Sequence, residues 1–118
     1  MLIIRKEQMT ALNSQARRRF IDRTVAHLRE LFPQQAGTRE VREWVTFVEQ
    51  GIQRARHYKI TRERDVTLFI DLQMGLGAEF DTQPAQGWVQ SILRRADLGS
   101  SEKMDLIYAQ LASREVEV

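Results

Sequence analysis

The sequence has no cysteine and only two prolines among its 118 residues. Without cysteine the chain can form no disulfide, no thiolate nucleophile and no cysteine-based zinc site, which fits a reducing cytoplasm. Its apolar runs are too short to span a bilayer, and Met1–Arg5 lacks the basic-then-apolar order of a signal peptide. We therefore expect a soluble, cytoplasmic protein with no membrane contact. A chain of this length can bury a core as one domain over residues 1–118.

Lys and Arg are absent from residues 65–93. Residues 1–64 hold 14 Lys and Arg against 7 Asp and Glu, whereas residues 65–118 hold 4 against 9. A basic half followed by an acidic half indicates either an external acidic partner or two halves of the chain that face one another. We favour the second interpretation and keep the first open.

Apolar residues recur at helical spacing along most of the chain, and this periodicity predicts an all-α fold of about five helices. The central helix is Arg64–Leu76, whose apolar side chains cover all but a narrow stripe of its circumference. Because a helix with so much apolar surface must be covered, we expect the others to wrap around it. These are predicted over Lys6–Phe32, over the region after Thr38, from Pro84 onward, and over Glu102–Ala112.

Local residue types predict where these helices end. Thr38 and Thr61 are the expected N-caps of the second and third helices. Gly75-Leu76-Gly77 should close the central helix, because glycine readily adopts positive φ. Gln34–Gly37 is predicted to be a turn, and Met1–Arg5 a short extended lead-in.

Helical periodicity also predicts which residues face inward. Leu31 and Val41 both fall on the apolar faces of their helices. Gly51 lies at the flank of the second helix's apolar face, where glycine costs about 1 kcal/mol relative to alanine. We therefore expect a neighbouring helix to approach closely at Gly51.

Two polar side chains fall within apolar arcs. Gln73 lies among the apolar residues of the central helix, so its amide must find hydrogen-bond partners. Arg17 lies within the apolar arc of the first helix, and the acidic central helix offers Asp65 or Asp71 as its counter-charge. We predict that Gln73 is buried and hydrogen-bonded, and that Arg17 reaches an acid within residues 65–81.

No group of residues indicates a reaction. His27 and His57 lie on different helices without an acidic residue at metal-ligand spacing, and we expect His27 to be half-buried and hydrogen-bonded. Four acids around the central helix could form a catalytic pair, although helix caps and ion-pair partners are the commoner roles; they are Asp65, Asp71, Glu79 and Asp81. Gly75-Leu76-Gly77 lacks the third glycine and the preceding strand of a phosphate-binding loop. We therefore expect no enzymatic activity and assign no catalytic residue, metal or cofactor.

Arg17-Arg18-Arg19 and Arg23 raise the question of nucleic-acid binding. Consecutive residues on a helix point about 100° apart, so three adjacent arginines do not make one patch. No aromatic residues alternate with them, as a single-strand binder would need. We expect a solvated face in which Asp22 is placed to pair with Arg18 and Arg19.

Several short segments follow one another as they do in a known group of proteins. They are the opening MLIIR-x-EQ, Phe20-Ile21-Asp22-Arg23, Ala26-His27-Leu28-Arg29, Phe32-Pro33, Gly51-Ile52, Glu63-Arg64-Asp65-Val66, Phe80-Asp81-Thr82 with Pro84 and Trp88, and Met104-Asp105 with Tyr108. In these segments the chain resembles small bacterial proteins encoded among type VI secretion effector genes. The resemblance implies a co-chaperone or adaptor that helps to load an effector onto the secretion spike.

We accordingly expect a non-enzymatic binding module whose partner is a secretion effector or that effector's chaperone. An immunity protein that neutralises a cognate toxin is the second interpretation, and a nucleic-acid-binding regulator the third. Phe47 and Leu106 stray furthest from the inward faces of their helices, so they are the candidate partner contacts. The sequence defines neither the partner nor the oligomeric state.

Overall fold

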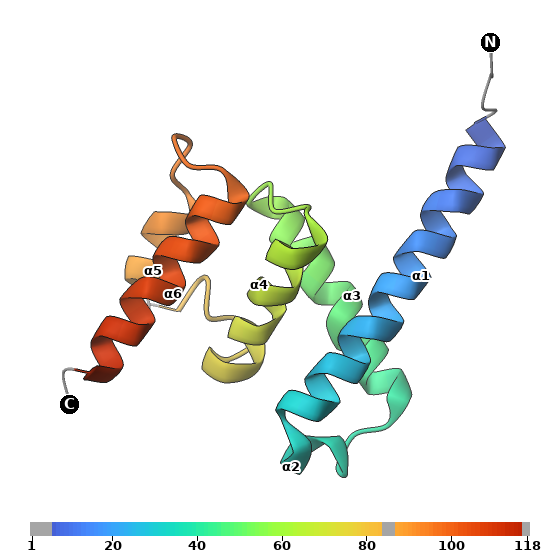
Figure 1. Cartoon of the computed structure of the whole chain (residues 1–118), viewed down its shortest axis with the longest axis horizontal. Helices are drawn as coiled ribbons and strands as arrows, with labels where there is room; N and C mark the ends of the chain where they lie inside the picture. The colour runs from blue at the N-terminus through green and yellow to red at the C-terminus, as the bar shows by residue number, and fades with distance from the viewer. Residues whose placement is uncertain (1–5, 84–86, 117–118) are drawn as a thin grey trace. The chain divides into compact units, whose positions relative to one another are not determined.

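The structure is a computed structural model that describes residues 6–83 and 87–116, with side chains from residue 14 to residue 114. The described residues form six α-helices and no strand, so the all-α prediction is confirmed (Figure 1). The helices are α1 (Lys6–Leu31), α2 (Pro33–Ala36), α3 (Val41–His57), α4 (Glu63–Leu76), α5 (Gly87–Leu93) and α6 (Ser100–Val116). The predictions for Met1–Arg5 and Pro84 lie outside the described residues.

The chain divides into two compact units, Met1–Glu49 and Gln50–Val118. The first contains α1, α2 and the beginning of α3. The second contains the rest of α3 with α4, α5 and α6. The single domain expected over residues 1–118 stays a prediction.

α2 is the helix that the sequence did not predict. It is one turn long and occupies the predicted turn after α1. Pro33 takes its first position, where the missing backbone N–H would have had no helical partner. The side chains of α2 are not buried, which leaves a helix this short without the apolar stripe that periodicity could detect.

The first unit buries one face of α1 and the beginning of α3. Its buried apolar side chains are Phe20, Ile21, Val25, Leu28, Trp44 and Val48. Thr24 is buried among them, and its hydroxyl donates to the Phe20 carbonyl at 2.7 Å. Leu31 and Val41, predicted to face inward, are 52% and 59% exposed, so this prediction is wrong. They are the last residue of α1 and the first of α3, and periodicity gives the direction of an apolar face but not where along the helix that face is covered.

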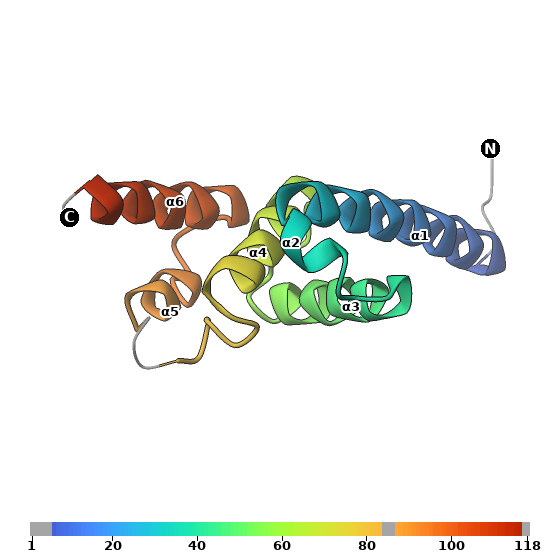
Figure 2. The same cartoon turned by 90° about the horizontal axis from the view of Figure 1, so that it is seen from below.

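The second unit is built around α4. Val66, Phe69, Ile70 and Leu72 are buried, whereas Leu68, Met74 and Leu76 remain partly exposed. α6 contacts both α4 and α5, and Figures 1 and 2 show α5 and α6 side by side. The Phe69 ring packs against the rings of Phe80 and Tyr58, with centroids 5.1 and 6.1 Å apart. The predicted central role of this apolar helix therefore holds within the second unit.

The predicted N-caps are wrong, whereas the predicted glycine closure of α4 is right. The Thr38 hydroxyl donates to the preceding Gln35 carbonyl, because α3 begins only at Val41. α4 follows Arg62, which makes no side-chain cap, so Thr61 stands one residue too early. Gly77 has φ +116° and donates its N–H to the Gln73 carbonyl at 3.0 Å, which ends α4.

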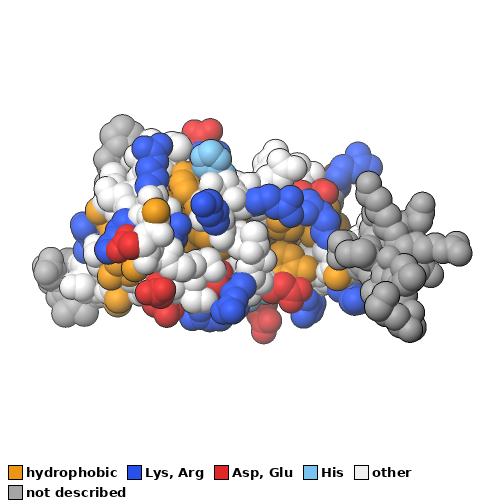
Figure 3. Space-filling view, turned by 90° about the horizontal axis from the view of Figure 1, so that it is seen from above, with side chains coloured by type: hydrophobic (Ala, Val, Ile, Leu, Met, Phe, Trp, Pro, Cys, Tyr) orange, Lys and Arg blue, Asp and Glu red, His pale blue; other side chains and the backbone are white. Residues whose placement is uncertain are grey.

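The surface carries both signs of charge. Arg18 pairs with Asp22 as predicted, at 3.7 Å across one exposed turn of α1. On the face drawn in Figure 3, basic and acidic side chains are interspersed with hydrophobic ones. None of the helices in the described ranges combines the length and the apolar character needed to cross a membrane.

Gly51 provides a test of the packing between α3 and α4. A Cβ at Gly51 would lie 2.6 Å from Ile70 Cγ1 and 2.7 Å from Gln73 Oε1, and both of these side chains are buried. The close approach predicted at this glycine is confirmed. We expect Gly51→Ala to lower the free energy of unfolding by about 1–3 kcal/mol in urea denaturation, through overpacking.

Gly75→Ala is the matched control, because Gly75 is also helical and a Cβ there meets nothing within 4 Å. It should leave stability unchanged or raise it by up to about 1 kcal/mol. Equal effects of the two substitutions would contradict the close packing at Gly51.

Candidate anion-binding site

Gln73 is buried as predicted. Its side chain is 5% exposed, and Nε2 donates to the Ala78 carbonyl at 3.0 Å. The bond ties the end of α4 to the loop that follows it. The other amide atom, Oε1, is buried without a hydrogen-bond partner in the described part of the chain.

Asp65 is fully buried, with partners that the sequence did not predict. Its Oδ2 accepts hydrogen bonds from the hydroxyls of Ser100 and Ser101, each at 2.8 Å, and Oδ1 accepts from Arg64 Nη1 at 3.1 Å. Arg64 Nη2 also donates to Asp105 at 3.1 Å. Asp65 therefore joins the beginning of α4 to the beginning of α6, which is a structural role.

The other predicted polar residues are Asp71 and Arg17. Asp71 is partly buried near Tyr108, whose phenol donates to the Leu68 carbonyl at 2.7 Å. Burial, and then the charge of Asp71, raise the pKa of Tyr108. Arg17 is partly buried in the first unit. Its pairing with an acid of residues 65–81, which belong to the second unit, stays a prediction.

Phe47 and Leu106, the predicted partner contacts, are both partly buried. The guanidinium of Arg39 lies 5.5 Å from the Phe47 ring centroid and 5.1 Å from that of Trp44, so it covers part of Phe47. Their role as contacts stays a prediction.

A buried polar cluster fixes the loop after α4. Asp81 is buried, with Oδ1 accepting from Arg54 Nε at 2.6 Å and Oδ2 from the Tyr58 hydroxyl at 2.6 Å. Arg54 Nη2 also donates to the Thr82 hydroxyl at 3.3 Å. Burial, and then the hydrogen bond and charge of Asp81, raise the pKa of Tyr58 from 10.0 to about 12. The sequence suggested an ion-pair partner for Asp81 without identifying one.

The end of α3 places Tyr58 and Lys59. The Lys59 N–H donates to the Arg56 carbonyl at 2.9 Å, and the Ile60 N–H to the Ala55 carbonyl at 3.0 Å. These two bonds form a Schellman closure, and both Ala55 and Ile60 are fully buried, as the apolar contact of that motif requires. Tyr58 and Lys59 are thus held at a fixed position beyond the helix.

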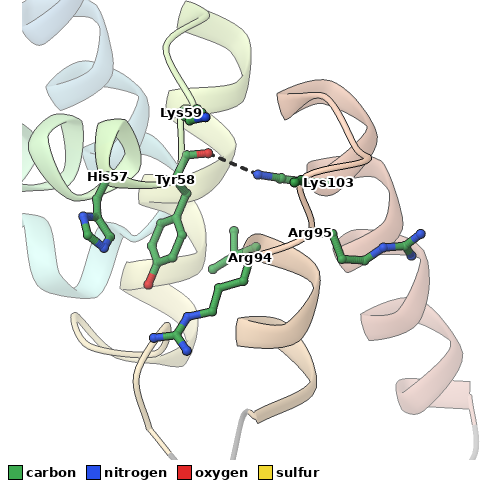
Figure 4. A pocket seen from close by; sticks show the side chains of 8 residues that line it. His57, Tyr58, Lys59, Arg94, Arg95 and Lys103 are labelled. Carbon is green, nitrogen blue, oxygen red and sulfur yellow. Dashed lines mark hydrogen bonds between the residues drawn. The ribbon is translucent and has the colours of Figure 1, made fainter.

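A pocket of about 240 Å³ lies beside this closure, entirely within the second unit (Figure 4). It is lined by His57, Tyr58, Lys59, Leu93, Arg94, Arg95, Ala96 and Lys103. Five of these eight residues carry or can carry a positive charge, and none is acidic. Residues 65–118 contain only four Lys and Arg, and three of them line this pocket.

Lys103 is the buried cation of the pocket. It is 6% exposed, and its Nζ crosses from α6 to donate to the Tyr58 carbonyl at 3.2 Å (Figure 4). Burial, and then the charge of Lys59, lower the pKa of Lys103. No carboxylate of a described residue pairs with it. An ammonium can donate three hydrogen bonds, so one carbonyl leaves it with unused capacity.

The other basic side chains of the pocket differ in their partners. Arg95 is paired with Asp97 through two hydrogen bonds and points away from the rest in Figure 4. Arg94 extends toward the hydroxyl end of Tyr58, and its charge offsets a small part of the rise in the Tyr58 pKa. Arg94 and Lys59 are exposed and form no ion pair with a described residue. The pocket therefore holds an excess of positive charge.

Helix ends account for part of this arrangement. His57, Lys59 and Arg94 lie at the carboxyl ends of α3 and α5, where cations are favoured by the helix dipole. Lys103 comes instead from the first turn of α6, where its charge is not favoured. Its position is explained by the hydrogen bond to the Tyr58 carbonyl across the pocket, a contact that the sequence did not predict. The concentration of Arg94, Arg95 and Lys103 within an otherwise acidic half was the available signal.

Comparison of the chain with protein-family models, with curated proteins and with solved structures finds no match. Within residues 14–83 and 87–114, no three His, Asp or Glu side chains come together as a metal ion would require. The site is therefore interpreted from its own geometry.

The Asp81 cluster gives a stability prediction. Asp81→Ala leaves the Tyr58 hydroxyl and the Arg54 guanidinium without their carboxylate. Because Arg54 is partly exposed, we expect a loss of about 2–4 kcal/mol in urea denaturation, below the full cost of breaking a wholly buried pair. Asp97→Ala, at an exposed pair, should leave stability nearly unchanged. A small loss from Asp81→Ala would contradict the anchoring role.

Tyr58 gives a prediction in alkaline solution. The fold raises its pKa from 10.0 to about 12, so folding favours the neutral phenol. This stabilisation is complete below pH 10 and is lost as the pH rises toward 12. The difference in unfolding free energy between the wild type and Tyr58→Phe should therefore shrink over that interval. A difference that stays constant would show that the phenol is not held neutral by the fold.

Proposed function

We propose that this chain is a non-enzymatic binding module for a protein partner that presents an acidic segment. The observation that carries this proposal is the pocket beside α3, with its buried Lys103 and no acidic lining residue. A concave site lined by one sign of charge raises the local concentration of oppositely charged groups. An acidic segment supplies the charge that the pocket lacks.

The size of the pocket favours a charged group of a larger partner. Pockets that enclose drug-sized ligands or cofactors usually span about 300–1,000 Å³. The volume here is about 240 Å³, and the pocket is open to solvent. A side chain or chain end of a protein fits this space better than a complete cofactor does.

The identity of the partner rests on the sequence resemblance. We propose an adaptor or co-chaperone role, with a type VI secretion effector or that effector's chaperone as the first partner to try. The pocket is compatible with such a role because adaptors bind without changing their partner chemically. An immunity protein would use the same pocket against a toxin, so the two roles differ in the protein that is bound.

The test is a pull-down from the native host followed by measurement of affinity with the purified prey. Capture of an effector or its chaperone supports the adaptor role, whereas capture of a single toxin domain that loses its activity on binding supports the immunity role. Tight binding of duplex DNA that persists near 200 mM salt would instead favour a nucleic-acid regulator.

The pocket variant makes this test specific. We expect Lys103→Met to weaken binding of the purified prey by about tenfold, because a buried charge-assisted hydrogen bond is lost. Arg56→Gln removes an exposed charge of α3 outside the pocket and should have little effect. Thermal midpoints of both variants establish that they are folded. Equal affinity of Lys103→Met and the wild type would exclude the pocket as the partner contact.

A further inference from the structure

Lys59 has a backbone conformation that its residue type does not favour. Its φ is +63°, and within the described ranges it is the one non-glycine residue with positive φ. The Schellman closure of α3 places it at the position after the helix cap, where glycine is the usual residue. A side chain with a Cβ is strained in this left-handed region. The position therefore carries a lysine in spite of the backbone, which suggests a use for its side chain.

The charge of Lys59 acts on Lys103. Both residues line the same pocket, and repulsion from Lys59 adds to burial in lowering the pKa of Lys103. The Tyr58 carbonyl is the one hydrogen-bond acceptor of Lys103 among the described residues. Two like charges are thus held near one another, and an anion bound beside them would relieve their repulsion.

We infer that Lys59 and Lys103 together form a binding site for a carboxylate group. The group is an Asp or Glu side chain or the chain end of the partner, so the inference rests on the proposed function and names the chemistry that it recognises. The two oxygens of a carboxylate can accept hydrogen bonds from both ammonium groups. Lys103 is the buried donor and Lys59 the exposed one.

The surroundings favour a carboxylate over a phosphate. Phosphate sites are commonly built at the amino ends of helices, where the dipole is positive. Lys103 comes from the first turn of α6, but the rest of the pocket lies at the carboxyl ends of α3 and α5, where the dipole is negative and repels a doubly charged anion more than a singly charged one. Leu93 and Ala96 add apolar lining that suits the methylene groups next to a carboxylate.

Small probes test the site without the partner. Nuclear magnetic resonance titrations at pH 7 and constant ionic strength would compare N-acetyl-diglycine, its amide, and inorganic phosphate. We expect saturable shifts of the amides of residues 57–59 and 103 with the carboxylate, none with the amide, and weaker binding of phosphate. N-acetyl-Gly-Glu-Gly-amide then distinguishes a side-chain carboxylate from a chain end, and binding of either supports the inference.

Substitutions assign the binding to the two lysines. Lys59→Gln and Lys103→Met should each weaken binding of the carboxylate probe by about tenfold, as expected for loss of a charge-assisted hydrogen bond. Arg56→Gln removes one charge from the same end of α3 and should leave binding unchanged. Lys59→Gly should raise the urea midpoint, because glycine adopts the positive φ without strain, and it should also weaken binding of the carboxylate probe. A purely structural Lys59 would give the first effect without the second.

Three results would overturn the inference. They are phosphate binding as tight as that of the carboxylate, shifts of equal size with the neutral amide, and unchanged carboxylate affinity in both lysine variants. The proposed function fails separately. If the small carboxylate binds but Lys103→Met keeps its affinity for the purified prey, the site stands and its role in partner binding does not.

Discussion

Tyr58 connects four segments of the second unit through three kinds of contact. Its hydroxyl holds Asp81 in the loop after α4, its carbonyl accepts the Lys103 ammonium of α6, and its ring packs against Phe69 of α4. The residue itself follows α3, where the helix closure fixes it. The pocket depends on this arrangement, because Tyr58 lines the pocket and its carbonyl accepts the hydrogen bond that holds Lys103 there.

Sequence patterns predicted those features that one helix determines by itself. Gly51 and Gln73 were recognised because their positions on a helical wheel fix what they face. Leu31 and Val41 were placed wrongly, because periodicity cannot say how far along a helix its covering partner extends. The pocket was missed because its residues come from the ends of α3 and α5, from the segments that follow them and from α6, and Lys103 meets Tyr58 across 45 positions of sequence. No local pattern records such a pairing.

The uneven distribution of charge along the chain is explained in part by the residues of the pocket. Residues 65–118 are acidic as a whole, yet three of their four basic residues gather at one site, to which the end of α3 adds His57 and the closure after it adds Lys59. Buried acids elsewhere in the second unit have partners, as Asp65 and Asp81 show. The contrast is between acids that have several hydrogen-bond partners within the unit and a lysine that has only the Tyr58 carbonyl among the described residues. Such an imbalance is what a ligand of opposite charge can correct.

Several side-chain hydrogen bonds of α6 reach far back along the chain. Ser100 meets Asp65 across 35 positions, Tyr108 meets the Leu68 carbonyl across 40, and Lys103 spans the longest interval. During synthesis, Tyr58 and α4 therefore leave the ribosome before the residues of α6 that bond to the Asp65 carboxylate and to the Tyr58 and Leu68 carbonyls. These groups stay hydrated until α6 has been synthesised, and contacts between residues so far apart in sequence form slowly. The second unit is completed from its last helix, not from the apolar one at its centre.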